Sequence, residues 1–189
     1  MKFLFVAVAL LGIPLLSHAD QVDQYVEAEM AKREIPGLAL TLIQDGKITK
    51  TAGYGFANLE LKAPVKPETV FEIGSVTKQF TAACILVLQQ EGKLSVDDKI
   101  AKYLPETPAT WSEITIRHLL NHTSGIKNYN SLTGFELTKH LTQKQFITAL
   151  SQIPLEFQPG EQWKYCNTGY SLLGFIVENA SGKNYWDFL

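Results

Sequence analysis

The stretch that decides the fold runs from residue 71 to residue 88 and reads FEIGSVTKQFTAACILVL. From Phe80 to Leu88 only Thr81 is not apolar, which predicts a buried central helix, apolar all round. Gly92 follows as the residue expected just past its end. Ser75 and Lys78 stand three positions apart where this helix begins, so both side chains lie on one face of it.

A serine and a lysine placed in this way can form a nucleophile and its activating partner. A serine hydroxyl is a poor nucleophile unless a base takes its proton. Burial and the positive end of a helix both favour the neutral amine of Lys78, and the backbone N–H groups at that end can stabilise an oxyanion beside Ser75. The alternative interpretation is a helix-capping serine followed by a solvated lysine.

A second polar group, Tyr165-Cys166-Asn167, lies 90 residues after Ser75 and just before another predicted helix. A phenol beside a lysine can be partly ionised and can act as a general base or acid. An Asn side chain can bridge the lysine and a substrate amide. The alternative here is a core tyrosine followed by an asparagine that caps a helix.

Several blocks in the same order resemble the β-lactamase-related serine hydrolases, which include class C β-lactamases, DD-peptidases and family VIII-type esterases. The blocks are residues 71–81 (FEIGSVTKQFT), 114–125 (ITIRHLLNHTSG) and 157–170 (FQPGEQWKYCNTGY), together with the opening IPG at 35–37 and the Asp45-Gly46 turn. The resemblance covers roughly residues 21–189.

This resemblance implies a role for each polar residue. Ser75 would be the acylated nucleophile, and Lys78 and Tyr165 would share the proton transfers. Asn167 would orient Lys78 and bind the substrate amide. Cys166 stands where the family often has Ser or Ala, and we expect it to be a tolerated replacement with no part in the chemistry.

The resemblance also implies the fold class, which is α+β and β-lactamase/penicillin-binding-protein-like, with an antiparallel sheet flanked by helices and a mostly helical region around residues 95–160. The family has a third motif, Lys-Thr-Gly or His-x-Gly, on a strand far toward the C-terminus. No such motif follows Asn167, after which 22 residues remain. We therefore expect a C-terminally truncated member in which the C-terminal strands are missing.

Local patterns predict the other elements. Residues 21–34 form a helix that Pro36-Gly37 stops, and residues 38–44 and 47–54 form a hairpin around Asp45-Gly46. Short helices are expected over 97–104 and over 116–121 after Thr115. Thr142 and Gln145 form a capping box for the next helix, and residues 168–179 form another.

The first 19 residues have the pattern of a secretory signal peptide. Lys2 precedes an almost wholly apolar run from Phe3 to Leu16, and Ser17-His18-Ala19 offers small residues for cleavage before Asp20. An uncleaved anchor is the alternative, but the run is shorter than the roughly 20 residues that a bilayer needs. We expect residues 20–189 to be the N-terminal part of one β-lactamase-related serine hydrolase domain, periplasmic or secreted, with no stable membrane insertion after cleavage of the signal peptide.

Composition narrows the functional classes. A net charge of −2 without a basic run gives no sign of nucleic-acid binding. His118 and His140 have no ligand spacing with other His, Cys or carboxylate residues, so we predict no metal and no cofactor. His122 is best explained as part of a structural turn. Cys84 and Cys166 are expected to be buried free thiols, with a disulfide as the alternative.

Two functions from different classes are consistent with the sequence. The first is a serine hydrolase that forms an acyl-enzyme with an ester or amide, whether a β-lactam, a D-Ala peptide or a small ester. Its partner would be a small-molecule or peptide substrate. The second is a non-catalytic penicillin- or peptide-binding module or an inactive truncated fragment, which the missing third motif favours.

Overall fold

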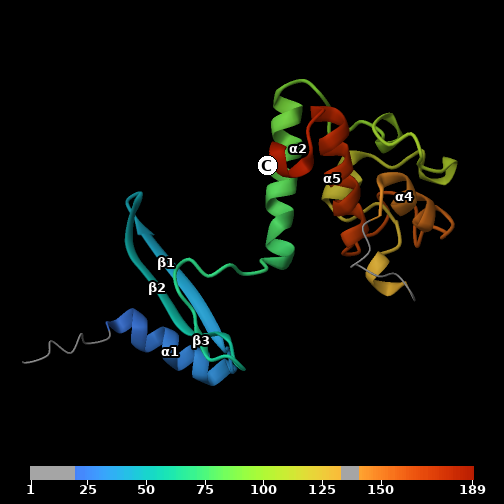
Figure 1. Ribbon diagram of the computed structural model, residues 1–189. Helices are drawn as coiled ribbons and strands as arrows, with labels where there is room; N and C mark the ends of the chain where they lie inside the picture. The colour runs from blue at the N-terminus through green and yellow to red at the C-terminus, as the bar shows by residue number, and fades with distance from the viewer. Residues whose placement is uncertain (1–19, 133–140) are drawn as a thin grey trace, which may run out of the picture. The chain divides into compact units, whose positions relative to one another are not determined.

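The computed structural model describes residues 20–132 and 141–189, and the chain divides into two compact units, up to Glu72 and from Ile73 onward (Figure 1). The predicted signal peptide, residues 1–19, lies outside the described residues, as does His140.

The first unit is one helix and a small antiparallel sheet. Helix α1 (Gln21–Arg33) is followed by strands β1 (Gly37–Gln44), β2 (Lys47–Asn58) and β3 (Ala63–Pro64), in the sheet order β1-β2-β3. The expected hairpin is confirmed, with positive φ angles at Asp45 and Gly46 that suit a two-residue turn. Strand β2 extends four residues beyond the predicted end at Tyr54, and its extension pairs with β3, which no sequence pattern indicated.

The start of α1 is joined to β2 by polar contacts. The Asp20 carboxylate accepts hydrogen bonds from the backbone N–H groups of Val22 and Asp23, which caps the helix. The Lys50 ammonium lies 2.7 Å from Asp20 and 2.6 Å from Asp23. The Tyr54 hydroxyl donates to Asp23 over 2.6 Å, so two β2 residues fix the position of the helix start.

The second unit is built around two packed helices, α2 (Thr77–Gln90) and α5 (Asn167–Ser181) (Figure 1). A 3₁₀ turn, η1 (Gly74–Val76), leads directly into α2. The remaining helices are α3 (Ile116–Leu120), α4 (Gln143–Ser151) and α6 (Tyr185–Phe188), and the 3₁₀ turns are η2 (Ile100–Lys102), η3 (Ala109–Trp111) and η4 (Tyr129–Ser131). The helix predicted over 97–104 is reduced to η2.

The core of the second unit lies between α2, α3, α4 and α5. It includes the fully buried residues Ile85, Leu88, Ile100, Leu104, Trp111, Ile114, Ile116, Leu119, Ile147, Leu172, Leu173, Ile176 and Val177. The first turns of α3 and α4 are closed by capping boxes from Thr115 and Thr142, the second of which the sequence predicted. Cys84 and Cys166 are buried free thiols.

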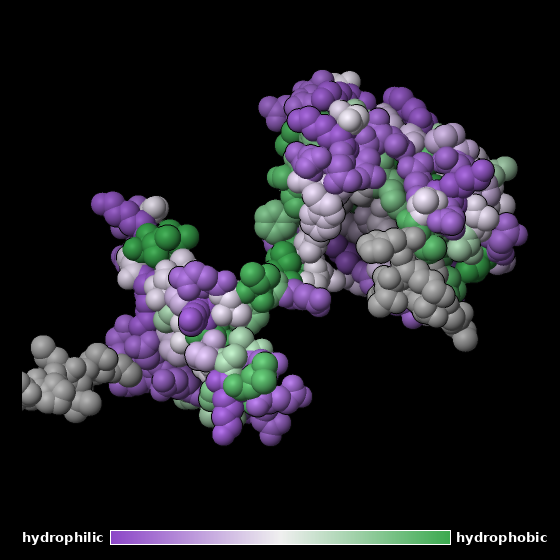
Figure 2. Space-filling model, viewed as in Figure 1, coloured by the Kyte–Doolittle hydropathy of each residue, from purple (hydrophilic) through white to green (hydrophobic). Residues whose placement is uncertain are grey.

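Helix α2, predicted to be a buried central helix, is buried on one face only. Its buried side chains are Thr81, Cys84, Ile85 and Leu88, whereas Phe80, Leu86 and Val87 are 45%, 54% and 44% exposed. Figure 2 shows this apolar surface along α2. The helix is apolar all round in sequence, but the core of its own unit covers only the face toward α5.

Candidate active site

The two halves of the site are carried by α2 and α5, which are packed against each other. Ser75 lies in η1 and Lys78 in the first turn of α2. Asn167 is the first residue of α5, and Tyr165 precedes it by two positions. Packing of the two helix starts therefore brings residues 90 positions apart to one point, and all four predicted site residues meet there.

Ser75 is contacted by two groups that can carry its proton. Its Oγ lies 2.6 Å from the Tyr165 hydroxyl and 3.2 Å from the Lys78 Nζ, which donates to it. The Lys78 Nζ also donates to the Asn167 Oδ1 over 2.6 Å. Ser75 is exposed, so a substrate can reach the hydroxyl.

Electrostatics at the site favour the ionised form of Tyr165. Hydrogen bonding to Lys78 and then to Ser75 lowers the pKa of the Tyr165 phenol, against a smaller opposing effect of burial. The Lys78 Nζ also lies 4.8 Å from the centre of the Tyr165 ring. A phenol with a lowered pKa beside a serine hydroxyl has the properties of a general base.

The Asn167 amide is oriented by two partners. Its Oδ1 accepts from Lys78, and its Nδ2 donates to the Asn130 Oδ1 over 2.6 Å. The Asn128 Oδ1 accepts the backbone N–H of Asn167 over 3.3 Å. The sequence analysis did not identify Asn128 and Asn130 as site residues. Their only signal in the sequence is that two asparagines stand two positions apart in a polar stretch.

Cys166 points away from the chemistry. Its Sγ is buried and donates to the Ile126 carbonyl over 3.3 Å, and burial raises the pKa of the thiol. A thiol with a raised pKa is a weak nucleophile at neutral pH. The Cys166 thiol therefore lies against Ile126, whereas Tyr165 contacts Ser75 and Asn167 contacts Lys78.

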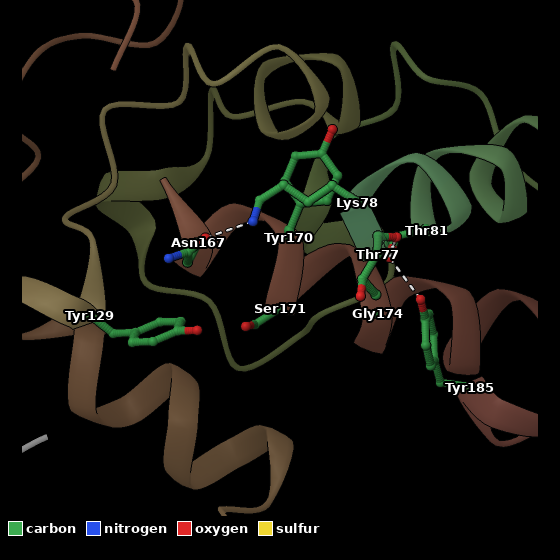
Figure 3. A pocket seen from close by; sticks show the side chains of 9 residues that line it. All are labelled: Thr77, Lys78, Thr81, Tyr129, Asn167, Tyr170, Ser171, Gly174 and Tyr185. Carbon is green, nitrogen blue, oxygen red and sulfur yellow. Dashed lines mark hydrogen bonds between the residues drawn. The ribbon is translucent and has the colours of Figure 1, made fainter. Parts of the chain in front are cut away.

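A pocket of about 250 Å³ opens beside Lys78 and Asn167 (Figure 3). Figure 3 shows the Tyr129 and Ser171 side chains facing each other across it, and at its far end the Thr81 and Tyr185 hydroxyls are 2.7 Å apart. The remaining lining residues are Thr77, Tyr170 and Gly174. The lining is uncharged except at Lys78.

Within residues 20–132 and 141–189, no group of three or more His, Cys, Asp or Glu side chains is arranged to hold a metal ion. The same residues contain no helix with the length and apolar character required to cross a bilayer.

His122, predicted to be structural, contacts the Tyr165 ring, with 4.7 Å between ring centres.

Comparison with known proteins identifies relatives in sequence and in structure. The chain is 37% identical over 162 residues to penicillin-binding protein 4* of Bacillus subtilis, and the aligned region covers 84% of this chain and 35% of the relative. The structure of this chain is similar to that of a class C β-lactamase, with a TM-score of 0.75 and 29% identity, and the match covers 88% of this chain and 45% of the β-lactamase. It is also similar to the D-amino acid amidase of Ochrobactrum anthropi SV3 (TM-score 0.74, 28% identity, 87% and 46%).

The chain thus spans about a third of the length of the curated relatives that it matches. The sequence profile of the beta-lactamase family matches residues 22–189, a range that holds all four residues of the site. The resemblance and the α+β fold expected from the sequence are both confirmed, and the chain belongs to the beta-lactamase family.

Proposed function

We propose that this protein is a serine hydrolase that forms an acyl-enzyme at Ser75, with Tyr165 as the general base. The observation that carries the proposal is the position of the Ser75 Oγ, within hydrogen-bond distance of both the Tyr165 hydroxyl and the Lys78 Nζ. A nucleophile in contact with a base that a third group orients is the usual arrangement for acyl transfer.

Unlike the neutral amine that the sequence favoured, Lys78 acts here as a cation, and its hydrogen bond and charge lower the pKa of Tyr165. Acylation therefore proceeds with Tyr165 as the phenolate. The Ser75 oxygen attacks the substrate carbonyl carbon while its proton moves to the Tyr165 oxygen, and the carbonyl electrons move onto the carbonyl oxygen. The backbone N–H of Ser75 stabilises this oxyanion. When the tetrahedral intermediate collapses, the bond to the leaving nitrogen or oxygen breaks, and that atom takes the proton from Tyr165. Water then hydrolyses the ester by the same steps.

Asn167 has two tasks in this scheme. Its Oδ1 holds the Lys78 ammonium beside Tyr165. Its Nδ2 carries two protons, of which one is donated to Asn130. The second is available for the carbonyl of a substrate amide.

Amides are the substrate class that these contacts support best. The amide donor of Asn167 and a pocket beside it that is uncharged except at Lys78 suit an acylamino group with an apolar side chain. A β-lactam with an acylamino side chain fits this description, and a D-amino acid amide offers the same kind of carbonyl to Ser75 but has a free amino group in place of the acylamino group. The similarity to a class C β-lactamase and to a D-amino acid amidase supports the same two classes. The leader-like pattern of residues 1–19 supports a periplasmic or secreted site of action.

The test is covalent labelling of the purified protein with a fluorescent penicillin and with a fluorophosphonate, read by intact mass and peptide mapping. We expect one adduct per chain on Ser75, lost in Ser75→Ala. Ser112→Ala, which changes an exposed serine after η3, is the matched control and keeps the adduct. An adduct that persists in Ser75→Ala, or the absence of any adduct in the unaltered protein, contradicts the proposal.

A further inference from the structure

His122 makes three contacts with the segment that carries Tyr165. The His122 carbonyl accepts the backbone N–H of Lys164 over 2.9 Å, and its Nδ1 accepts the backbone N–H of Cys166 over 3.2 Å. The His122 and Tyr165 ring centres are 4.7 Å apart, with 39° between the planes. One residue therefore fixes the positions before and after Tyr165 and also contacts its ring.

The backbone of His122 is suited to this role. It follows α3 with a φ of +60°, a left-handed conformation that His, Asn and Gly adopt more readily than most residues. The Thr123 carbonyl accepts the Gly160 N–H and the Gly125 carbonyl accepts the Glu156 N–H, each over 2.8 Å. These bonds align the segment after α3 with the segment that carries Tyr165.

The imidazole of His122 must be neutral to make these contacts. A backbone amide can only donate, so the Nδ1 that accepts the Cys166 N–H carries no proton, and the ring proton lies on Nε2. The titratable groups that face the ring are Lys78 from α2, Tyr165 from the segment before α5, and Tyr170 from α5, whereas Cys166 contacts the ring through its backbone N–H. Burial lowers the pKa of His122, and the positive charge of Lys78 lowers it further.

A second ring fixes the imidazole. Tyr170 lies on it with 5.1 Å between ring centres, whereas the exposed Trp163 meets only its edge at 6.1 Å. The Tyr170 hydroxyl donates to the Leu120 carbonyl over 3.1 Å, which ties that ring to α3. The imidazole is thus a fixed surface against which the Tyr165 phenol can lie in one orientation.

We propose that His122 is a positioning residue for Tyr165: its neutral ring and its Nδ1 acceptor hold the phenol oxygen at hydrogen-bond distance from the Ser75 Oγ. The inference rests on the proposed function for the role of Tyr165 as base. It assigns no proton transfer to His122, whose Nδ1 is already occupied by the Cys166 N–H.

The experiment compares three variants of the protein. His122→Gly removes the ring and the acceptor while allowing the left-handed backbone, and His122→Asn keeps an acceptor near the Nδ1 position and also tolerates that backbone. Trp163→Leu is the control, because it removes a ring that contacts His122 in a residue 67% exposed. The measurements are the rate constant for Ser75 acylation, KM, and the ultraviolet titration of the tyrosine phenolates.

For His122→Gly we expect acylation to fall about 10- to 100-fold, the loss typical of a misplaced catalytic group, with KM within about threefold. The low-pKa phenolate transition should move toward the ordinary value of about 10, because Tyr165 no longer faces Lys78 and Ser75 in one geometry. His122→Asn should recover part of the acylation rate and part of the low-pKa phenolate transition. Trp163→Leu should change the acylation rate by no more than about twofold and leave the transition in place.

The titration separates the two hypotheses, because it requires no turnover. If the unaltered protein forms no Ser75 adduct, the proposed function fails, yet an altered phenolate transition in His122→Gly still supports the positioning role. If the unaltered protein is acylated and both His122 variants match it in acylation and in titration, the positioning role is overturned and the proposed function stands.

Discussion

Replacing Tyr165 by Phe removes a single oxygen atom from the site and leaves most of its packing in place. That oxygen is 2.6 Å from the Ser75 Oγ, whereas the remaining candidate base, the Lys78 Nζ, is 3.2 Å away and already donates to Asn167. The phenyl ring can keep its stacking on His122. The variant therefore loses the proton acceptor and little else.

Loss of a positioned general base costs about 10²- to 10⁴-fold in rate, which corresponds to about 2.7–5.4 kcal/mol of activation free energy. We expect Tyr165→Phe to lower the acylation rate constant at Ser75 by at least about 10², with a fold unchanged by circular dichroism. The assay is stopped-flow acylation with nitrocefin or a p-nitrophenyl ester, combined with intact mass.

Tyr170→Phe is the matched control, since Tyr170 also stacks on His122 at 39° and its ring centre lies 5.4 Å from the Lys78 Nζ. Its hydroxyl donates to the Leu120 carbonyl and makes no hydrogen bond to Ser75, and burial raises the pKa of its phenol, whereas that of Tyr165 is lowered. Tyr170→Phe should cost about 0.5–1.5 kcal/mol of stability and keep the low-pKa phenolate transition that Tyr165→Phe abolishes. Equal rate losses in the two variants, or an unchanged rate in Tyr165→Phe, would refute the assignment of the base.

Two further predictions concern stability. Gly174→Ala should raise the free energy of unfolding by about 0.5–1 kcal/mol, because Gly174 lies inside α5 and an added Cβ would meet only the Tyr185 ring at 3.9 Å; a thermal melt that shows destabilisation would contradict this. Asp98 accepts from the Tyr103 hydroxyl, the Lys102 ammonium and the Ser95 N–H, which lowers its pKa to about 2. A pKa below the unfolded value means that the stabilisation is present above about pH 4 and is lost as the pH falls toward 2. Asp98→Asn should therefore melt earlier than the unaltered protein at pH 7, and its melting temperature should fall less between pH 4 and pH 2.

Much of the site could be predicted because its chemistry depends on local spacing. Ser75 and Lys78 are three residues apart at a helix start, so their proximity follows from helix geometry alone. The place of Tyr165 and Asn167 is different, because nothing local relates residue 165 to residue 75. The sequence related Tyr165 and Asn167 to Ser75 only through the order of several family-like blocks. The 2.6 Å contacts of Tyr165 with Ser75 and of Asn167 with Lys78 depend on the packing of α2 on α5.

The elements that the sequence missed are those set by distant contacts. Strand β3 is two residues long, too short for a period of two to be visible, and it exists because the end of β2 offers it a partner. The expected helix over 97–104 became a 3₁₀ turn because Ile100 donates its N–H to the Ile114 carbonyl and Lys99 pairs with Thr115. Asn130 was missed because it acts through Asn167, a relation that has no signature in sequence.

The structure also explains how the starts of α2 and α5 position Ser75, Lys78 and Asn167. Ile85 and Leu88 of α2 and Leu172, Leu173 and Ile176 of α5 belong to one core and are fully buried, so neither helix can shift without opening a cavity. Ser75, Lys78 and Asn167 therefore take their relative positions from a rigid core. Tyr165 lies just before α5, outside that regular structure, and it needs separate support, which the contacts of His122 with Lys164, Cys166 and the Tyr165 ring provide. The proposed base is thus the site residue that is attached least directly to the core, and His122 is the residue that makes that attachment.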